Sequence, residues 1–178
     1  MNGRALVTAA AALALVGALA GCASSADRSG MVAADVAVQT KHDRSVAVNT
    51  AGGAATGAMD SSNIEDADFK AAIEESIVAN QVFKRVVAGK NADYELLVTI
   101  VSLDKPLMGL DMTVNLEATW VLVRQSDRSV ALKKSIQTTH TATFSDASMG
   151  MTRLRLAVEG AARKNIEQGL AEIGKLTL

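Results

Sequence analysis

The chain has 178 residues, a formal net charge of −1 and only 3% aromatic residues. This near-neutral balance argues against a nucleic-acid partner, because phosphate binding needs clustered Lys and Arg, and the few aromatic rings argue against platforms on which bases or sugars stack. The single cysteine, Cys22, excludes an intramolecular disulfide and a CxxC metal or redox motif.

The first residues have the composition of an export signal. Residues 1–4 carry one positive charge, and residues 5–18 form an apolar run of Ala, Leu and Val that is interrupted only by Thr8 and Gly17. A membrane-spanning helix needs about 20 apolar residues, whereas this run is shorter and ends in small residues. Such a pattern is typical of a cleaved secretory signal over residues 1–21.

The stretch Leu19-Ala20-Gly21-Cys22 resembles the lipobox of bacterial lipoproteins. The resemblance implies cleavage between Gly21 and Cys22, acylation of the Cys22 thiol, and a mature chain attached to a membrane through this cysteine. Ala23, in place of Asp, implies sorting to the inner leaflet of the outer membrane, with the domain facing the periplasm. The alternative is an ordinary signal that ends near a buried thiol.

Removal of residues 1–21 leaves 157 residues with a charge of −2, which is enough for one domain. The small, polar composition after Cys22 predicts a flexible tether up to residue 34, followed by a single α+β domain over residues 35–178. Fully extended, such a tether would reach about 40 Å. We therefore expect a domain that need not touch the membrane.

The first half of the domain predicts a strand, a loop and a helix. Alternating valines favour one long strand from residue 35, or two short strands around residues 41–43. Residues 52–57 are rich in glycine but lack GxGxxG and P-loop spacing, which favours a plain connection over a phosphate site. Residues 62–65 match a capping box, and the spacing that follows predicts a helix to about Arg85.

The second half predicts an antiparallel meander and a closing helix. We expect strands over residues 94–101, 112–122 and 130–141, of which the second has the clearest alternation of apolar and polar residues. The last helix carries an apolar stripe that ends at Ile173. A second stripe of alternating charge predicts a solvent-exposed face rather than an anion site, and it contains Arg155, Glu159, Arg163 and Glu167.

The element order β-α-β-β-β-α predicts a two-layer α+β sandwich, with a mainly antiparallel sheet of three to four strands and two helices on one face. A right-handed crossover makes the first strand parallel to residues 94–101. Behind a lipobox, this arrangement resembles small outer-membrane lipoproteins such as the lipopolysaccharide-assembly lipoprotein and, more loosely, the auxiliary lipoproteins of envelope lipid transporters. The resemblance implies a role in binding or assembly.

Residues suited to catalysis are scarce. His42 and His140 stand apart from any HExxH or carboxylate pattern, so each is expected to be a surface or hydrogen-bonded residue. The sequence has no GxSxG elbow, and Cys22 is assigned to lipid. We therefore expect no catalytic residues, no metal site and no cofactor, and an envelope hydrolase or transferase is the least favoured alternative.

The candidate contact residues are apolar side chains in two polar loops. Methionine and leucine there suit irregular partner surfaces or acyl chains, although they could also fill core edges. The preferred hypothesis is a non-catalytic envelope lipoprotein that binds an unidentified envelope protein in assembly or maintenance. The alternative is a carrier that holds lipid or another apolar ligand between sheet and helices. The candidates are Leu107, Met108, Leu110, Met149 and Met151.

Overall fold

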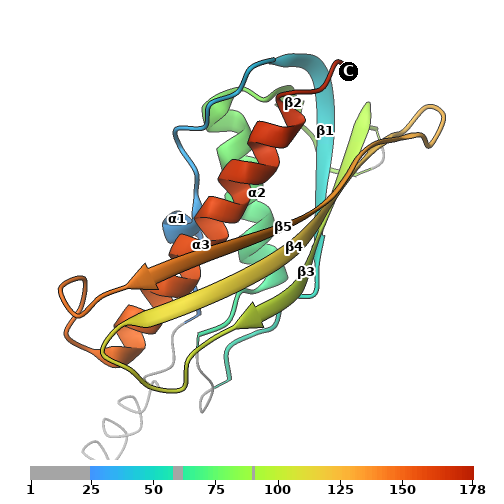
Figure 1. Ribbon diagram of the computed structural model, residues 1–178. Helices are drawn as coiled ribbons and strands as arrows, with labels where there is room; N and C mark the ends of the chain where they lie inside the picture. The colour runs from blue at the N-terminus through green and yellow to red at the C-terminus, as the bar shows by residue number, and fades with distance from the viewer. Residues whose placement is uncertain (1–24, 58–61, 90) are drawn as a thin grey trace, which may run out of the picture.

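A computed structural model describes residues 25–57, 62–89 and 91–178 of the protein (Figure 1). One five-stranded sheet in the order β2-β1-β3-β4-β5 forms one layer, and α2 and α3 lie together on one of its faces. The strands are β1 (His42–Ala51), β2 (Phe83–Val86), β3 (Tyr94–Asp104), β4 (Met112–Arg124) and β5 (Val130–Ala142). The helices are α1 (Arg28–Met31), α2 (Asp66–Asn80) and α3 (Gly150–Ile173).

The sheet is mixed. β1 pairs in parallel with both β2 and β3, whereas β3, β4 and β5 form an antiparallel meander. The predicted α+β class and the parallel first strand are confirmed. The predicted number of three to four strands is wrong, because a fifth strand, β2, extends the sheet beyond β1.

The extra strand lies where the sequence predicts the end of a helix. α2 stops at Asn80, and Gln81 adopts a left-handed conformation with a φ of 54° whose N–H donates to the carbonyls of the last helical turn. The chain turns there, and Phe83 is buried opposite His42 at the edge of the sheet. A four-residue strand with two exposed positions gives too short an alternation for its pattern to separate it from a helix.

Two other boundaries also differ from the predictions. Glu65 is the N-cap of α2 but makes no side-chain capping bond, so the predicted capping box does not form. Instead, Asp66 Oδ1 accepts a hydrogen bond of 2.9 Å from Gly53 N and fixes the preceding loop. Residues 35–41 lie outside the sheet, and β1 begins only at His42.

The core lies between the sheet and the two long helices. Its largest side chain, Trp120, is fully buried, and its Nε1 donates a hydrogen bond of 2.8 Å to Asn165 Oδ1 on α3. Asn165 Nδ2 in turn donates to the Ile136 carbonyl of β5 at 2.9 Å. α3 approaches the sheet closely because Gly160 faces His140 and Gly169 faces the indole ring, where no side chain would fit.

We predict that Gly169→Ala lowers the free energy of unfolding by about 1–3 kcal/mol, because overpacking a filled core forces neighbouring groups to shift. A Cβ at this position would lie 2.5 Å from Trp120 Cε2. Urea unfolding measures the change. Gly150→Ala is the matched control, since a Cβ there meets no atom closer than 3.7 Å, and equal stability of the two variants would contradict the packing argument.

Candidate functional site

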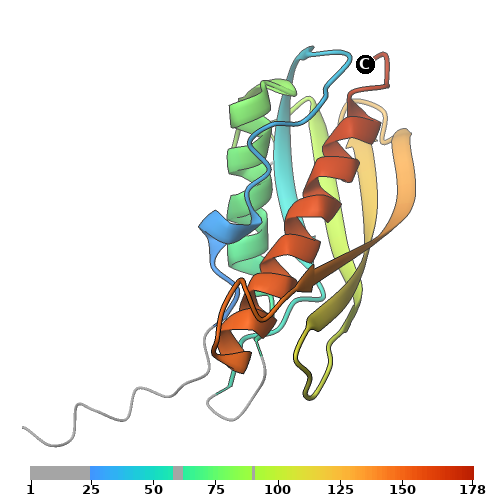
Figure 2. The ribbon, with the colours of Figure 1, turned by 60° about the vertical axis from the view of Figure 1, so that its left-hand side comes forward.

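The segment over residues 25–41, called the N-terminal segment below, lies across the groove between α2 and α3 (Figure 2). It contains the short helix α1, and its small and apolar side chains are buried. These are Ala26, Met31, Ala33 and Val36. The prediction of a flexible tether up to residue 34 is therefore wrong from Ser25 onward, because these residues belong to the core.

Hydrogen bonds fix the N-terminal segment to α2. Ala33 N donates to Ser76 Oγ at 3.0 Å, and Val36 N donates to Asn80 Oδ1 at 2.8 Å. Asn80 Nδ2 also donates to the Ala33 carbonyl at 2.7 Å. Polar side chains of α2 thus satisfy the backbone of a segment that joins no sheet.

Glu159 of α3 holds the other side of the N-terminal segment. Its Oε1 accepts a hydrogen bond of 2.8 Å from Asp27 N and lies 3.5 Å from Arg155 Nε. Glu159 is only 6% exposed, so the predicted solvent-exposed charge ladder is wrong at this position. Burial raises the pKa of this carboxyl, while the Asp27 amide and Arg155 oppose that rise.

Six exposed apolar side chains gather at one end of the molecule, and we call this set the apolar tip. Leu107 is 99% exposed and Met108 is 84% exposed, so the alternative that these residues fill core edges is wrong. Phe144 belongs to the set and was not predicted from the sequence, although it stands in the same polar loop as Met149. Met151, predicted before the last helix, lies in the first turn of α3. The apolar tip consists of Leu107, Met108, Leu110, Phe144, Met149 and Met151.

Arg153 connects the two loops of the apolar tip. Its Nη1 donates to the carbonyls of Ala147 and Ser148 at 2.7 and 2.9 Å, and its Nη2 donates to the Gly109 carbonyl at 3.4 Å. The guanidinium also lies over the Phe144 ring, 5.2 Å from its centroid. The β3–β4 loop and the β5–α3 loop therefore form one surface.

The N-terminal segment begins close to this surface. Ala26 N donates to the Asn63 carbonyl at 3.0 Å. Lys105 Nζ, at the base of the β3–β4 loop, binds Asn63 Oδ1 and donates to the Ser62 carbonyl at 2.9 Å. Figure 2 shows the start of the described chain and both tip loops at the lower end of the molecule.

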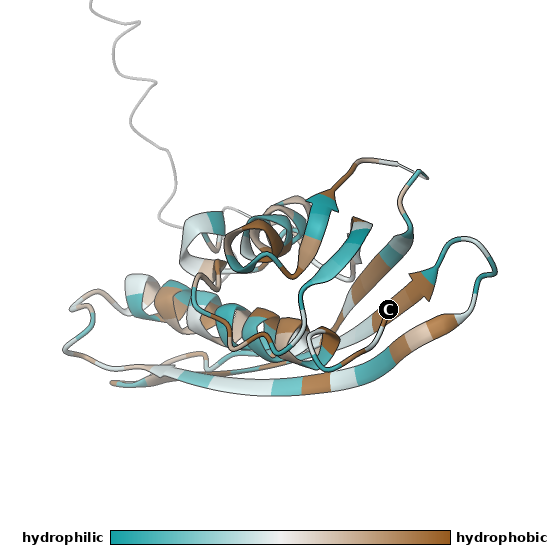
Figure 3. Cartoon of the chain, turned by 90° about the horizontal axis from the view of Figure 1, so that it is seen from above, coloured by the Kyte–Doolittle hydropathy of each residue, from teal (hydrophilic) through white to brown (hydrophobic). Residues whose placement is uncertain are grey.

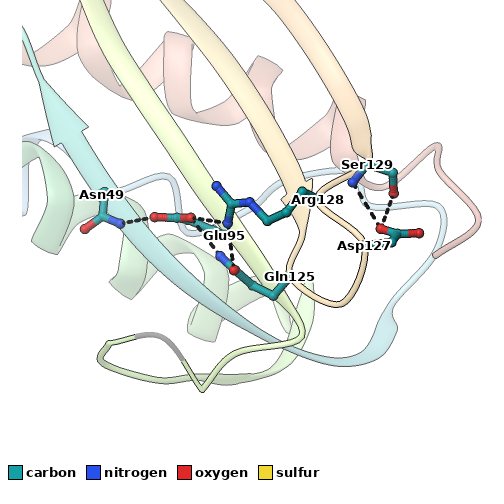
Figure 4. Close-up of polar contacts among 6 residues, drawn as sticks. All are labelled: Asn49, Glu95, Gln125, Asp127, Arg128 and Ser129. Carbon is teal, nitrogen blue, oxygen red and sulfur yellow. Dashed lines mark hydrogen bonds and ion pairs between the residues drawn. The ribbon is translucent and has the colours of Figure 1, made fainter.

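The helices leave the opposite face of the sheet bare (Figure 3). Its polar side chains bind one another across neighbouring strands. Glu95 of β3 accepts hydrogen bonds from Asn49 of β1 and Gln125 of the β4–β5 turn, and it pairs with Arg128 at 3.4 Å (Figure 4). Further along this face, Ser135 donates to Glu117 and lowers the pKa of that carboxyl.

Two surface concavities of about 750 and 560 Å³ lie at the end opposite the apolar tip, beside Arg124 and Lys84 respectively. The carrier alternative places a ligand elsewhere, between sheet and helices. In the described core that space is filled by fully buried side chains, among them Leu116, Trp120 and Ile166.

The two histidines do not form a catalytic pair. His42 is buried and its Nε2 lies 3.1 Å from the Ile173 carbonyl, which confirms the expectation of a hydrogen-bonded residue. His140 packs against Gly160, and burial lowers its pKa. Among the described residues, three or more His, Cys, Asp or Glu side chains nowhere gather as metal ligands would. No helix within the described ranges is long and apolar enough to span a membrane.

The fold is that of a two-layer α+β domain whose helices cover one face of a five-stranded mixed sheet. It is similar to protein XCC0632 from Xanthomonas campestris, of family DUF330, with a TM-score of 0.59 and 11% identity over 79% of this chain and 89% of that chain. It is also similar to protein CT253 from Chlamydia trachomatis, with a TM-score of 0.51 and 9% identity over 74% of this chain and 98% of that chain. The likeness to a minor lipoprotein from Acinetobacter baumannii is weaker, with a TM-score of 0.42 and 10% identity over 80% of this chain and 96% of that chain.

At these identities the likeness extends to the fold alone. No family model matches the sequence, and no curated protein matches it.

We predict that Glu159→Gln removes a pH-dependent loss of stability. Because the folded-state pKa of Glu159 lies above its ordinary value of 4.5, the folded state binds this proton more tightly, and stability falls as the pH rises from 4.5 through the raised pKa. Glutamine keeps the acceptor for Asp27 N without a charge. The free energy of unfolding of the variant, relative to the original protein, should therefore increase from pH 4 to pH 7 in urea titrations.

The exposed Glu167 of the same helix supplies the control, Glu167→Gln. This second variant should follow the pH dependence of the original protein. If Glu159→Gln does so as well, the buried carboxylate does not oppose folding at neutral pH.

Proposed function

We propose that the protein is a non-catalytic lipoprotein of the bacterial envelope. Acylated Cys22 holds it in the inner leaflet of the outer membrane with its domain facing the periplasm, and it acts as a binding partner in envelope assembly or maintenance. The observation that carries this proposal is the lipobox at residues 19–22, which combines a short apolar lead, small residues and the only cysteine. Cleavage there leaves the whole described domain on the mature chain.

The described domain supports a role in binding more than a role in catalysis. Its histidines are separate and packed into the fold, and its carboxylates on the bare sheet face are engaged with neighbouring polar groups. Its most exposed large apolar side chains are instead Leu107, Met108 and Leu110 of the tip. Residues of this kind recognise surfaces through burial and adaptable packing rather than through proton or group transfer. The apolar tip is the contact surface in this proposal.

Cys22→Ser should abolish acylation and move the protein from the membrane fraction to the soluble fraction of the periplasm. Two or more acyl chains give durable attachment, and a chain without them loses that attachment. Intact-mass spectrometry and membrane flotation report the change, with Ser126→Ala at the β4–β5 turn as a control that keeps both properties. A Cys22→Ser protein with unchanged mass and flotation would contradict the proposed anchor.

Affinity capture from crosslinked cells tests the binding role. The acylated protein should enrich a defined set of envelope components that the Cys22→Ser variant, expressed to the same level and folded by circular dichroism, does not enrich. Equal capture by both variants would show that anchorage does not determine the partner.

A further inference from the structure

No other part of the described chain packs over the side chains of the apolar tip. Single exposed valines such as Val78 also occur elsewhere on the surface, and scattered apolar residues of this kind are ordinary. The tip differs because six large apolar side chains lie on two loops and the first turn of α3, which Arg153 joins into one surface. Clustered exposure of this kind marks a contact surface.

The short stretch of chain between Cys22 and Ser25 limits how far the apolar tip can lie from the proposed anchor. Ser25 is three residues from Cys22, and three residues span at most about 10 Å. Ser25 lies at the end of the molecule that carries the apolar tip. Its neighbour Ala26 and Lys105, at the base of the β3–β4 loop, both bind Asn63. A domain anchored at Cys22 is therefore held with its apolar tip near the membrane, rather than at the distance of about 40 Å that a long tether would allow.

We propose that the apolar tip inserts into the surface of the bilayer that holds Cys22. The inference rests on the proposed lipid anchor and names the lipid surface as the partner of the apolar tip. Leucine, methionine and phenylalanine side chains on a short loop enter the boundary between headgroups and acyl chains, where burial of apolar area stabilises the bound state. Acyl anchor and tip then form a two-point attachment that fixes the orientation of the domain.

The charges beside the apolar tip indicate which lipids it contacts. Asp104 and Asp111 flank the β3–β4 loop, and Asp146 lies in the β5–α3 loop, all three exposed. The basic Arg153 is buried and bound to loop carbonyls, and the Lys105 ammonium is bound to Asn63 and the Ser62 carbonyl. Carboxylates are repelled by anionic headgroups, so insertion depends on apolar burial and takes place on zwitterionic phospholipid.

The test uses the full acylated protein on phosphatidylcholine vesicles. Because the Cys22 thiol is acylated in this proposal, Met108→Cys provides the only free thiol for an environment-sensitive nitrobenzoxadiazole label. The label at position 108 should shift its emission to the blue and be quenched by spin-labelled lipid. Addition of phosphatidylglycerol should not be needed for either effect.

Two matched variants isolate the apolar tip. A label at Ser126→Cys, in the β4–β5 turn, sits at the other end of the 13-residue strand β4, about 40 Å away, and should stay in water. In the second variant, Leu107→Ser and Leu110→Ser are combined with the label at position 108, and the blue shift and quenching should be lost. Both loop residues are exposed, so folding is retained and is checked by circular dichroism.

The outcomes separate the inference from the proposed anchor. A protein that floats with the vesicles while the label at position 108 stays in water overturns insertion of the apolar tip and leaves the anchor intact. A protein that does not float, or whose Cys22 reacts with the label, overturns the anchor and the inference together. In a third outcome, the label at position 108 stays in water on vesicles, and position 108 crosslinks to one envelope protein in cells. This result overturns the lipid surface as the partner and assigns the apolar tip to that protein.

Discussion

The sheet of this protein buries one face only, and the structure depends on how that face is covered. α2 and α3 lie side by side over it, and the N-terminal segment packs against both helices. Met31 is fully buried there, and buried side chains of both helices bind the backbone of the segment. Residues that closely follow the proposed anchor, Cys22, are thus also part of the core.

Much of the fold could be predicted from local pattern. The alternation in residues 112–122 and the rule for right-handed crossovers were sufficient for β4 and for the parallel pairing of β1 with β3. The N-terminal segment could not be predicted in this way, because Ala26 and Ala33 have the small side chains of a linker and are buried only through tertiary contacts. Glu159 likewise has the spacing of a surface residue and is covered by a segment distant in sequence.

The candidate site was predictable in composition but not in arrangement. Leu107 and Met108 stand out as apolar residues in a polar loop, and so does Met149 before α3. Their assembly into one surface depends on Arg153, whose partners include carbonyls 5, 6 and 44 residues away. The closeness of this surface to Ser25 depends on Asn63, which contacts both Ala26 and Lys105. Neither link has a local sequence signal.

The N-terminal segment also has a mechanical consequence. If the chain is anchored at Cys22 as proposed, a force on that end acts first on the bonds of Ser25, Ala26 and Asp27 to the domain. To reach further from the membrane, the protein would have to release Ala26 and Met31 from the core, which would expose apolar surface on both helices. With the proposed anchor at Cys22, reach and folding are therefore coupled, because each added residue of reach weakens the fold.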